Sequence, residues 1–380
     1  TNMKKLFLFF LIILFGAGAF FAASAANHND NAKHTSRRVL ARTAQEAAQA
    51  RAHGCHLARR VKDLHAFVCA QQDADALGLT EDIRVFAFDA GANNQIGATT
   101  VHAGGNTGIG RKVVILDTGY NYTHPELSSS YLGGKDFVND DNDPLDDQGH
   151  GSHVAGIITA DGINANAKGV APHAGIIAGK VLDALGSGFF SDIIAGIYWA
   201  VDGPDGIATT SDDFNADAIN LSLGTGNPYL YKGFCDSVMP ELTAAIKYAK
   251  YRGVTVVVAA GNTAKGVSIP GCISYSTTVG AVDSADRIAR FSGRGSAVDI
   301  VAPGVKIFSS VLGSGYATWD GTSMATPMVA GVVALIKSAH SGYTPAQVEQ
   351  AMFSTAKDLG SFGKDTVFGW GRINAWGAAQ

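Results

Sequence analysis

Short continuous apolar runs alternate with longer amphipathic stretches from residue 112 to the C-terminus. The apolar runs predict buried strands at residues 112–116, 176–182, 218–223 and 254–260. The intervening and following stretches predict helices at residues 150–159, 191–200, 240–251 and 323–340. Strands that alternate with helices predict an α/β fold, a mostly parallel twisted sheet with helices on both faces that binds ligands at the carboxyl ends of its strands.

Residues 36–90 show a different order of patterns. They predict strands at residues 38–42, 56–60, 65–69 and 83–88, and helices at residues 43–53 and 73–79. This β-α-β-β-α-β order predicts a small α+β unit. A turn near Lys62 and Asp63 would place Cys55 and Cys69 almost opposite each other, so we expect a disulfide between them. Residues 91–110 are rich in Gly and Asn, and they are predicted to form a linker and loops at a domain boundary.

The N-terminus has the pattern of an export signal. Lys4 and Lys5 precede an apolar run over residues 6–21, and Ala23-Ser24-Ala25 has the A-x-A form of a cleavage site. We therefore expect residues 1–25 to be a signal peptide and the protein to be secreted. A single membrane anchor is the alternative, but the run is short and no second apolar span follows it.

Composition and charge narrow the class of protein. The chain has 380 residues, of which 46% are hydrophobic and 16% are charged, which is typical of a globular protein. Its formal net charge of -4 argues against a nucleic-acid or anionic-membrane partner and leaves room for bound cations. In an exported chain the 4 cysteines are expected to be oxidised, and Cys235 with Cys272 forms the second local pair.

Two candidate catalytic side chains lie in the first half of the large domain. Asp117 ends the first buried strand, where an α/β sheet holds its active site, although a loop-capping role is equally expected. His150 begins a helix between Gly149 and Gly151, which leave space around an imidazole that acts as a general base. His153 is three residues further on, so a metal site with a carboxylate is an alternative. We rank it below catalysis because no third His or Glu has metal-ligand spacing.

Two further candidates lie nearer the C-terminus. Asn262 follows the strand at residues 254–260 and can direct an N–H₂ donor at an oxyanion, although an Asx turn better explains a lone Gly-Asn pair. Ser323 lies in the first turn of the last long helix, where free N–H groups stabilise negative charge; taken alone, it is more simply a helix cap. Together the candidates supply an acid, a base, an oxyanion donor and a serine, in the order Asp, His, Asn, Ser.

The segments around these side chains resemble the motifs of the subtilisin-like serine peptidases (subtilases), over about residues 96–380. The matching segments are the one around Asp117, His-Gly-Ser-His-Val-Ala-Gly, Ala-Ala-Gly-Asn and Gly-Thr-Ser-Met-Ala-Thr-Pro. The resemblance implies that Ser323 is the nucleophile and His150 the base and acid. It implies that Asp117 orients His150, and that Asn262 and the Ser323 N–H bind the oxyanion. Ser152 stands where the family usually has Thr.

The resemblance also implies a polypeptide substrate that binds as an added strand. The edge segments that would hold it are Gly186-Ser187-Gly188 and Ser222-Leu223-Gly224. Ala259, Ala260 and Gly261 would line the primary specificity pocket, and Phe190 would flank an outer apolar pocket. Ordinary loop geometry is the alternative explanation of the glycines.

Residues 26–95 resemble, more loosely, the inhibitory propeptide of the family, so residues 96–380 would form the peptidase domain. The resemblance implies a precursor that the enzyme cuts near residues 89–95. Its own propeptide would assist folding and act as an intramolecular inhibitor. The mature enzyme is then expected to be a monomer without a membrane anchor, and a structural accessory domain is the alternative for the small unit.

Calcium is the metal that the resemblance implies, in a structural role and not in the chemistry. Residues 136–143 place carboxylate and amide oxygens in one loop, so we expect a Ca²⁺ site at Asp140, Asp141 and Asp143, with a solvated acidic turn as the alternative. A second family-type site would pair Glu126 with residues 161–167, although Glu replaces the expected Asp. The insertion at residues 202–213 is a weaker third candidate.

The prediction for the whole chain is a secreted serine endopeptidase, made as a preproprotein, that hydrolyses peptide bonds through an acyl-enzyme. One alternative is a catalytically silent binding module that keeps the sheet and the peptide groove, against which the intact catalytic set argues. The other is metal-dependent hydrolysis through His150 and His153.

Overall fold

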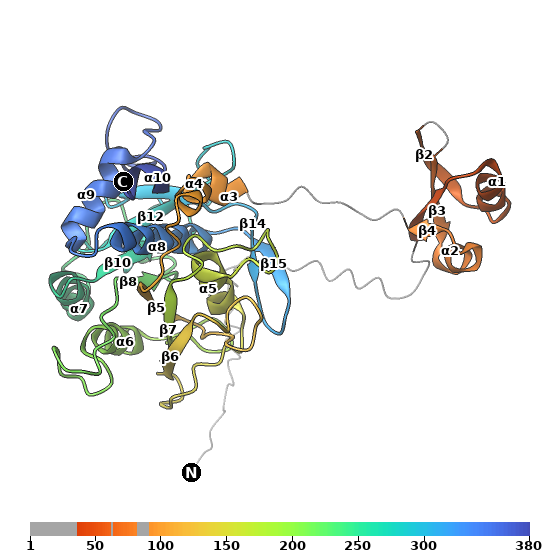
Figure 1. Cartoon of the computed structure of the whole chain (residues 1–380). Coiled ribbons are helices and arrows are strands. Elements are labelled where there is room, and N and C mark those ends of the chain that lie inside the picture. The colour runs from red at the N-terminus through yellow and green to blue at the C-terminus, as the bar shows by residue number, and fades with distance from the viewer. Residues whose placement is uncertain (1–35, 62–63, 82–90) are drawn as a thin grey trace, which may run out of the picture. The chain divides into compact units, whose positions relative to one another are not determined.

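The computed structural model describes residues 36–61, 64–81 and 91–380 (Figure 1). The chain divides into two compact units between residues 86 and 87, and each is described here by itself. The predicted signal peptide, the turn at residues 62–63 and the strand at residues 83–88 lie outside the described residues.

The small unit is an antiparallel sheet with two helices. Its strands run in the order β2-β3-β1-β4, with bounds Ser36–Ala41 (β1), His56–Val61 (β2), Leu64–Ala70 (β3) and Thr80–Glu81 (β4). Helix α1 (Ala44–Ala52) begins with a capping box between Thr43 and Glu46, and α2 (Gln71–Leu77) ends at Gly78 in the left-handed conformation. The predicted disulfide between Cys55 and Cys69 is present. The α+β prediction is therefore confirmed over the described residues.

The large unit is built on a seven-stranded sheet with the order β13-β12-β10-β8-β5-β7-β6, and every pair in it is parallel. The strands are Lys112–Asp117 (β5), Tyr131–Asp136 (β6), Gly175–Lys180 (β7), Ala218–Leu221 (β8), Thr255–Ala259 (β10), Thr277–Val282 (β12) and Ile300–Pro303 (β13). Central strands of such a sheet are buried on both faces, which is why they show as continuous apolar runs.

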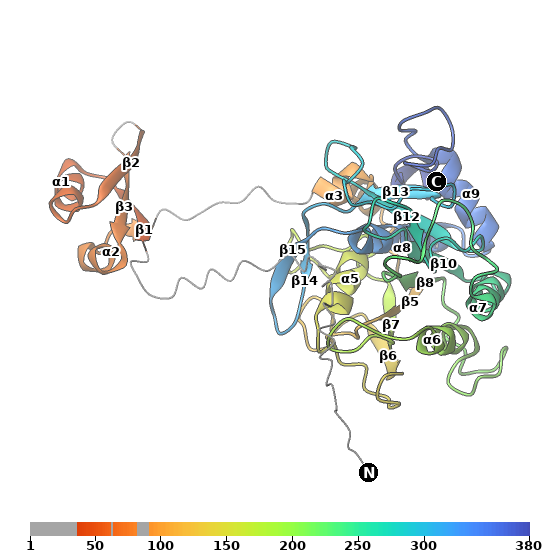
Figure 2. The ribbon, with the colours of Figure 1, turned by 180° about the vertical axis from the view of Figure 1, so that it is seen from behind.

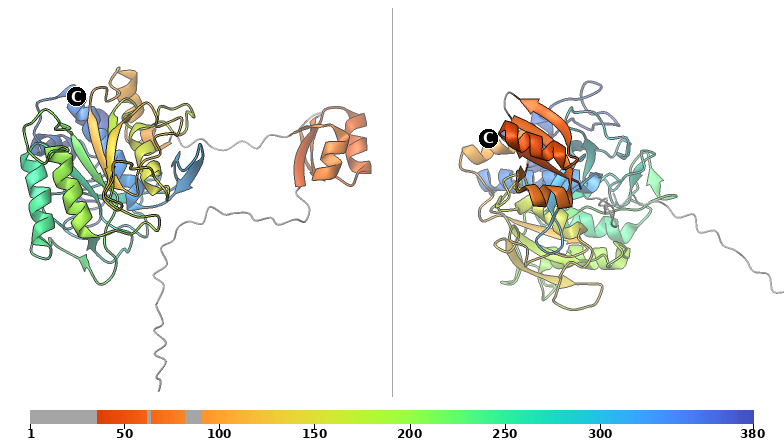
Figure 3. Two further views of the ribbon diagram at one scale, coloured as in Figure 1. Left: turned by 90° about the horizontal axis from the view of Figure 1, so that it is seen from below. Right: turned by 90° about the vertical axis from the view of Figure 1, so that its right-hand side faces the viewer.

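Helices cover both faces of this sheet, as predicted. Alternate residues of β5 show the two sides: Val113 and Ile115 join a core with α5 (His150–Thr159) and α8 (Thr322–Ala339), whereas Val114 and Leu116 join a core with α6 (Phe190–Asp202) and α7 (Pro240–Tyr251). Figure 1 labels the helices of both faces, and Figure 2 shows the same helices from behind. Helices α6 and α7 lie side by side in the left view of Figure 3.

Helix α8 packs against the centre of the sheet, on strands β5, β8, β10, β12 and β13. Within the described residues it is the one helix long and apolar enough to cross a membrane, but 78% of that stretch is buried inside the protein. Its apolar character is therefore that of a core helix.

The predicted linker at residues 91–110 is wrong for its first part. Helices α3 (Gly91–Gln95) and α4 (Ala98–Ala103) form there, and Ile96, Ala98 and Val101 are buried in the core that contains α8. Apolar residues at helical spacing are present, but Asn, Thr and Gly around them hide the pattern. The sequence predicts that the peptidase domain begins at residue 96, whereas the large unit of the structure begins before that residue.

Smaller elements complete the large unit. Two short antiparallel ladders, which the sequence did not predict, pair β9 (Leu230–Tyr231) with β11 (Val267–Ser268), and β14 (Ile307–Ser310) with β15 (Tyr316–Trp319). Helices α9 (Pro345–Thr355) and α10 (Ala375–Ala378) follow α8. A disulfide joins Cys235 to Cys272, as predicted, and so connects the segment before α7 to the segment after β11.

Candidate active site

The side chains of Asp117 and His150 meet at the carboxyl end of β5. Asp117 is fully buried at the end of the strand, and its Oδ1 lies 2.7 Å from His150 Nδ1. His150 is the first residue of α5, and its side chain is 23% exposed. The ring is therefore held at Nδ1 from the protein side, and Nε2 is the nitrogen left for another partner.

The loop that presents His150 is organised by Asp146, a buried residue that the sequence analysis missed. Its Oδ1 accepts the N–H groups of Gln148 and Gly149 (3.0 and 2.9 Å), and its Oδ2 accepts the N–H and hydroxyl of Ser152 (2.8 and 2.6 Å). Burial would raise the pKa of Asp146, but these hydrogen bonds outweigh it and lower the pKa. The hydroxyl of Ser152 thus has a structural role, which a Thr hydroxyl could equally fill.

Gly151 allows a close approach of α5 to the end of β5. A Cβ at this position would collide with the carbonyl oxygen of Gly119. The sequence analysis attributes this glycine to space around the imidazole, and the structure gives a different reason: the backbone of α5 packs directly on the segment that follows Asp117.

The pKa of His150 reflects two opposing effects. Burial favours the neutral ring and lowers the pKa, whereas the charge of Asp117 and its hydrogen bond favour the protonated ring and raise it. The second effect is larger, so the pKa of His150 is raised above its ordinary value. A raised pKa makes the imidazole a better proton acceptor near neutral pH.

Ser323 is the second residue of α8, after the N-cap Gly321 and Thr322, so it is not the helix cap. Its hydroxyl donates to the carbonyl oxygen of Ser222 at 3.0 Å, and the hydroxyl of Ser222 donates to the carbonyl of Ser323 at 2.9 Å. These reciprocal bonds fix the first turn of α8 beside the end of β8. N–H groups in a first helical turn have no partner within the helix, so this turn can bind negative charge.

Asn262 lies against the same helix turn. Its Oδ1 accepts both the N–H and the hydroxyl of Thr322, each at 2.9 Å, and the hydroxyl of Thr322 accepts the N–H of Gly261 at 3.1 Å. Because the oxygen of the amide is fixed, its Nδ2 is the exposed donor beside Ser323. The side chain is therefore bound to α8 and does not close a local Asx turn.

Comparison with known proteins agrees with this geometry. Residues 108–371 match the model of the subtilase family. The chain is 40% identical to subtilisin from Bacillus pumilus over 295 residues, which cover 76% of this chain and 97% of the relative. It is 41% identical to a thermophilic serine proteinase from Bacillus sp. (strain AK1), covering 71% of this chain and 61% of that relative, and 38% identical to an alkaline protease from Alkalihalobacillus alcalophilus, covering 81% and 77%.

The chain belongs to the subtilase family. It is a subtilisin-like serine endopeptidase with an α/β fold, as the resemblance had implied. The candidate residues of this subtilase differ in how the surrounding structure holds them.

The two predicted substrate edges flank the site of this subtilase as loops. Gly186 has φ +74, and the turn around it is closed by Asp183, whose Oδ1 accepts the N–H groups of Leu185 and Ser187 at 2.9 and 3.0 Å. Gly188 lies against Val181, where a Cβ would collide with a carbonyl oxygen. Phe190 begins α6 and is partly buried. No described residue pairs with these edges in a sheet.

Ser268 lies between Gly224 of the second predicted edge and Gly261 of the predicted primary pocket, and sequence reasoning missed it. A Cβ on Gly261 would lie 2.7 Å from Ser268 Oγ, and a Cβ on Gly224 would collide with the same atom. Ser268 is fully buried, and its N–H donates to the carbonyl of Ala260 at 3.0 Å. Ser268 lies in β11, which pairs with β9, so a pattern within one segment could not have found it.

His153 does not join His150 in a metal site. Its ring stacks on Trp319 with centroids 4.4 Å apart, and its Nε2 lies 3.1 Å from the carbonyl oxygen of Ala317. Burial lowers the pKa of His153 to about 3, so the ring stays neutral. Across the described parts of the chain, no three His, Cys, Asp or Glu side chains are grouped to hold a metal ion. The geometry thus gives His153 a structural role.

The calcium site predicted at Asp140, Asp141 and Asp143 does not fit the geometry. Asp140 is 90% exposed and lies 3.4 Å from Lys135 Nζ. The carboxylates of Asp141 and Asp143 instead accept donors of their own loop and of Tyr122. The acidic side chains of the third candidate, residues 202–213, likewise accept N–H and hydroxyl groups within their own segment. The family resemblance implied calcium, but Asp140, Asp141 and Asp143 do not form a group that could hold a metal ion. In the third candidate, Asp205, Asp212 and Asp213 gather around the hydroxyl of Thr210 instead.

Glu126, the second candidate ligand, is fully buried and already saturated with donors. Its carboxylate accepts the N–H groups of Gly162, Ile163 and Asn164 at 2.7, 3.1 and 2.6 Å, and the hydroxyl of Tyr316 at 2.9 Å. Burial and Glu126 raise the pKa of Tyr316 to about 12, so the phenol remains a donor. The loop at residues 161–167 therefore turns N–H groups, and not carbonyl oxygens, toward the carboxylate, which does not suit a cation.

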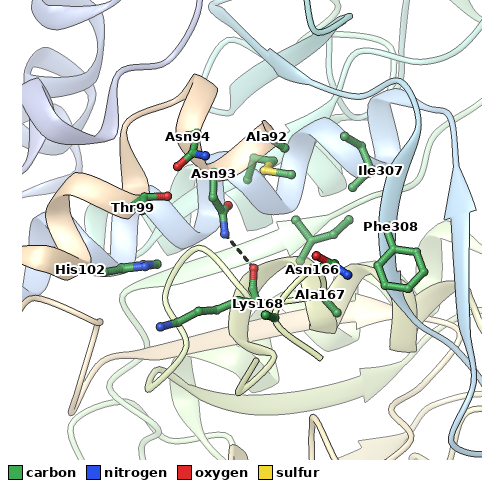
Figure 4. A pocket seen from close by; sticks show the side chains of 13 residues that line it. Ala92, Asn93, Asn94, Thr99, His102, Asn166, Ala167, Lys168, Ile307 and Phe308 are labelled. Atoms are coloured by element: carbon green, nitrogen blue, oxygen red, sulfur yellow. Dashed lines mark hydrogen bonds between the residues drawn. The ribbon is translucent and has the colours of Figure 1, made fainter. Parts of the chain in front are cut away.

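A pocket of about 260 Å³ lies between α3, α4 and the residues around Lys168, away from the catalytic side chains (Figure 4). Asn93 closes one side by donating to the carbonyl of Lys168 at 2.7 Å (Figure 4). His102 lines it with an imidazole whose pKa is lowered by burial. The pocket thus lies where α3 and α4 pack on the rest of the large unit.

Proposed function

We propose that this subtilase is a secreted endopeptidase that cleaves polypeptides with Ser323 as nucleophile, His150 as base and acid, and Asp117 as the residue that orients His150. The observation that carries the proposal is the 2.7 Å contact between Asp117 Oδ1 and His150 Nδ1, in a unit where α5, which begins at His150, packs against α8, which carries Ser323. It leaves Nε2 of the ring to accept the proton of Ser323.

The reaction follows from these positions. The Ser323 hydroxyl turns from the carbonyl of Ser222 toward His150, gives up its proton and attacks the peptide carbonyl carbon. The oxyanion that forms accepts hydrogen bonds from Asn262 Nδ2 and the Ser323 N–H. His150 then donates its proton to the leaving amine, and water, deprotonated by His150, hydrolyses the acyl-enzyme.

The substrate lies between Gly186-Ser187-Gly188 and Ser222-Leu223-Gly224, with one side chain between Gly224 and Ala259-Ala260-Gly261. Ser268 covers both glycines, so small and medium-sized side chains fit there better than large aromatic ones. Calcium has no part in this chemistry.

Residues 1–25 are proposed to direct secretion, and the small unit is proposed to be a propeptide that the enzyme removes by cutting itself. Helix α3 packs within the large unit from Gly91 onward, so the cut is expected before residue 91. The mature enzyme is proposed to be a monomer.

Replacement of the nucleophile tests the function directly. The Ser323→Ala precursor should accumulate uncut, and the protein should not react with a fluorophosphonate that labels the wild type. Ser314→Ala, an exposed serine in the turn between β14 and β15, is the matched control and should be processed and labelled normally. Normal maturation of Ser323→Ala expressed alone would refute self-cleavage, and an unlabelled, inactive wild type would favour the silent binding module.

A further inference from the structure

Lys180 is a buried lysine in a position that no catalytic role explains. It is the last residue of β7, only 2% of it is exposed, and it pairs in register with Asp117 of β5. Lysine is almost never buried to this degree unless its ammonium group has partners. Its contacts therefore show what the charge is for.

The ammonium group binds three acceptors from three different segments. Lys180 Nζ donates to the carbonyl oxygens of Thr118 and Leu182 at 2.8 and 2.9 Å, and to Asp147 Oδ1 at 2.7 Å. An ammonium group has three N–H donors, so these contacts use its full capacity. A neutral or shorter side chain could not replace it at this point.

Each of the three segments carries one part of the proposed site. Thr118 follows Asp117, whose carbonyl oxygen accepts the N–H groups of Val181 and Leu182 at 2.9 and 3.0 Å. Asp147 belongs to the loop that presents His150. Leu182 leads directly into the substrate edge.

The link from Leu182 to the substrate edge is short and rigid. The next residue, Asp183, is bonded to Ser187 in both directions: its N–H donates to the carbonyl of Ser187 at 2.8 Å, and its Oδ1 accepts the N–H of Ser187. The His150 loop reaches the same edge, because a Cβ on Gly186 would lie 3.4 Å from Gln148 Nε2. The ammonium group thus lies where the Asp strand, the His loop and the edge converge.

We propose that Lys180 is a positioning residue that couples the substrate edge at Gly186–Gly188 to the Asp117–His150 pair. This inference rests on the proposed function. A peptide that binds along the edge restrains Leu182. The contacts of the Lys180 ammonium group then restrain Thr118 and the His150 loop. Misplacement of reacting groups by about 1 Å can cost up to roughly 100-fold in rate, so such coupling matters for catalysis.

The test compares Lys180→Met with Lys112→Met. Both lysines lie on the central sheet and donate to a backbone carbonyl, but Lys112 begins β5 at the opposite edge, where it donates to Phe214. For each mature enzyme, kcat and KM are measured on a short acyl ester and on a peptide with four residues before the scissile bond. The gain is defined as kcat/KM for the peptide divided by kcat/KM for the short ester.

We expect Lys180→Met to reduce this gain about tenfold, chiefly through kcat, while Lys112→Met retains it even if its melting temperature falls. An unchanged gain in folded Lys180→Met would overturn the inference and leave the proposed function intact. A wild type without Ser323-dependent cleavage would instead refute the proposed function.

If Lys180→Met does not fold or mature, Asp147→Ala decides the question. The Asp147 side chain is 49% exposed, so its truncation removes one arm of the ammonium contact with little effect on folding. A twofold to fivefold smaller gain is expected, and Asp143→Ala, at another exposed aspartate, is the control. A gain equal to that of the control would overturn the coupling.

Discussion

The two halves of the active site are held by different kinds of interaction. Around Asp117 and His150 the contacts are those of buried charges: the carboxylate of Asp146 binds the His150 loop, and the ammonium of Lys180 binds the strand ends. Around Ser323 and Asn262, the contacts between described residues are made by amide, hydroxyl and backbone groups. The half that is proposed to change its protonation is thus built from charges, and the half that is proposed to receive the oxyanion is built from neutral dipoles.

This difference follows from what each half must do. In the proposed mechanism His150 gains and loses a proton, so a fixed negative charge beside it sets its pKa. The oxyanion needs donors that are already oriented when it forms, and neutral groups held by the backbone supply these without a titration of their own. Substitutions in the two halves should therefore differ in their pH dependence as well as in their size.

The largest effect is expected for Asp117→Asn. Loss of the carboxylate removes the acceptor that fixes His150 in the productive tautomer, and in other Ser-His-Asp enzymes such a change lowers kcat by about 10⁴-fold. Single-turnover kinetics on the mature protein measure it, with Asp143→Asn as an exposed control. A loss below about tenfold would show that Asp117 does not orient His150.

Asn262→Ala should have the next largest effect. Removal of the equivalent oxyanion donor from a subtilisin costs roughly 10²–10³-fold in kcat, and because this chain belongs to the same family we expect a loss of that size here. KM should change little, because the donor acts mainly on the transition state. A large rise in KM with unchanged kcat would instead place Asn262 among the substrate-binding residues.

Asp146→Asn is expected to lower kcat about tenfold and to destabilise the protein. The amide would place N–H₂ donors against N–H and hydroxyl donors of the His150 loop, in a site that is 5% exposed. Kinetics and thermal unfolding should change together. Unaltered kinetics in a destabilised protein would show that the loop tolerates movement, and would weaken the contrast between the halves.

The pH dependence of kcat/KM separates the two halves most clearly. Because the pKa of His150 is raised, activity should begin to fall, as the pH is lowered, above the ordinary imidazole value of about 6.5. In Asp117→Asn burial is opposed only by the charge of Asp146, so the acid limb should move to lower pH. In Asn262→Ala it should stay where it is in the wild type, and a shift there would contradict the neutral character of that half.

The smallest effect on activity is expected for Glu126→Gln, which tests whether charge-based anchoring extends beyond the site. Loss of the buried carboxylate should lower the free energy of unfolding by about 2 kcal/mol, because hydrogen bonds to a charged group are lost. Asp140→Asn, at a 90% exposed side chain, should change it by less than about 0.5 kcal/mol. A calcium chelator should leave the melting temperature of the wild type unchanged. If the chelator lowers the melting temperature of the wild type but not that of Glu126→Gln, a cation is bound at this loop.

Much of the fold could be predicted from local patterns. Helices α5 and α7 have the predicted bounds, and β5 and β10 differ from theirs by one or two residues, because their apolar runs are continuous. Strand β6 was missed because its sequence, Tyr-Leu-Gly-Gly-Lys-Asp, has only two apolar residues in a row. Strand β13 is four residues long and ends at Pro303, which gives little signal.

The site divides in the same way. Asp117, His150, Asn262 and Ser323 could be proposed from the sequence because each follows or begins a strongly patterned element. Lys180, Glu126 and Ser268 were missed or misjudged because important contacts of each are distant in sequence, as with the separation of 62 positions between Lys180 and Thr118. No pattern within one segment reports which distant donors will surround a carboxylate after folding, and this is why the calcium prediction at Glu126 did not fit.

The order of the strands also determines when the large unit can fold. The interior strand β5 is made early, but its neighbour β8, the central strand, ends only at Leu221, and α8, which covers the middle of the sheet, begins only at Thr322. Contacts so distant in sequence form slowly, since the chain must close long loops before burial compensates for the lost entropy. The strands of the small unit lie within a short stretch of sequence, and the unit has its own core and its own disulfide. It can therefore be complete while the centre of the peptidase still awaits its last long helix, which gives a kinetic reason for the proposed folding assistant to precede the peptidase.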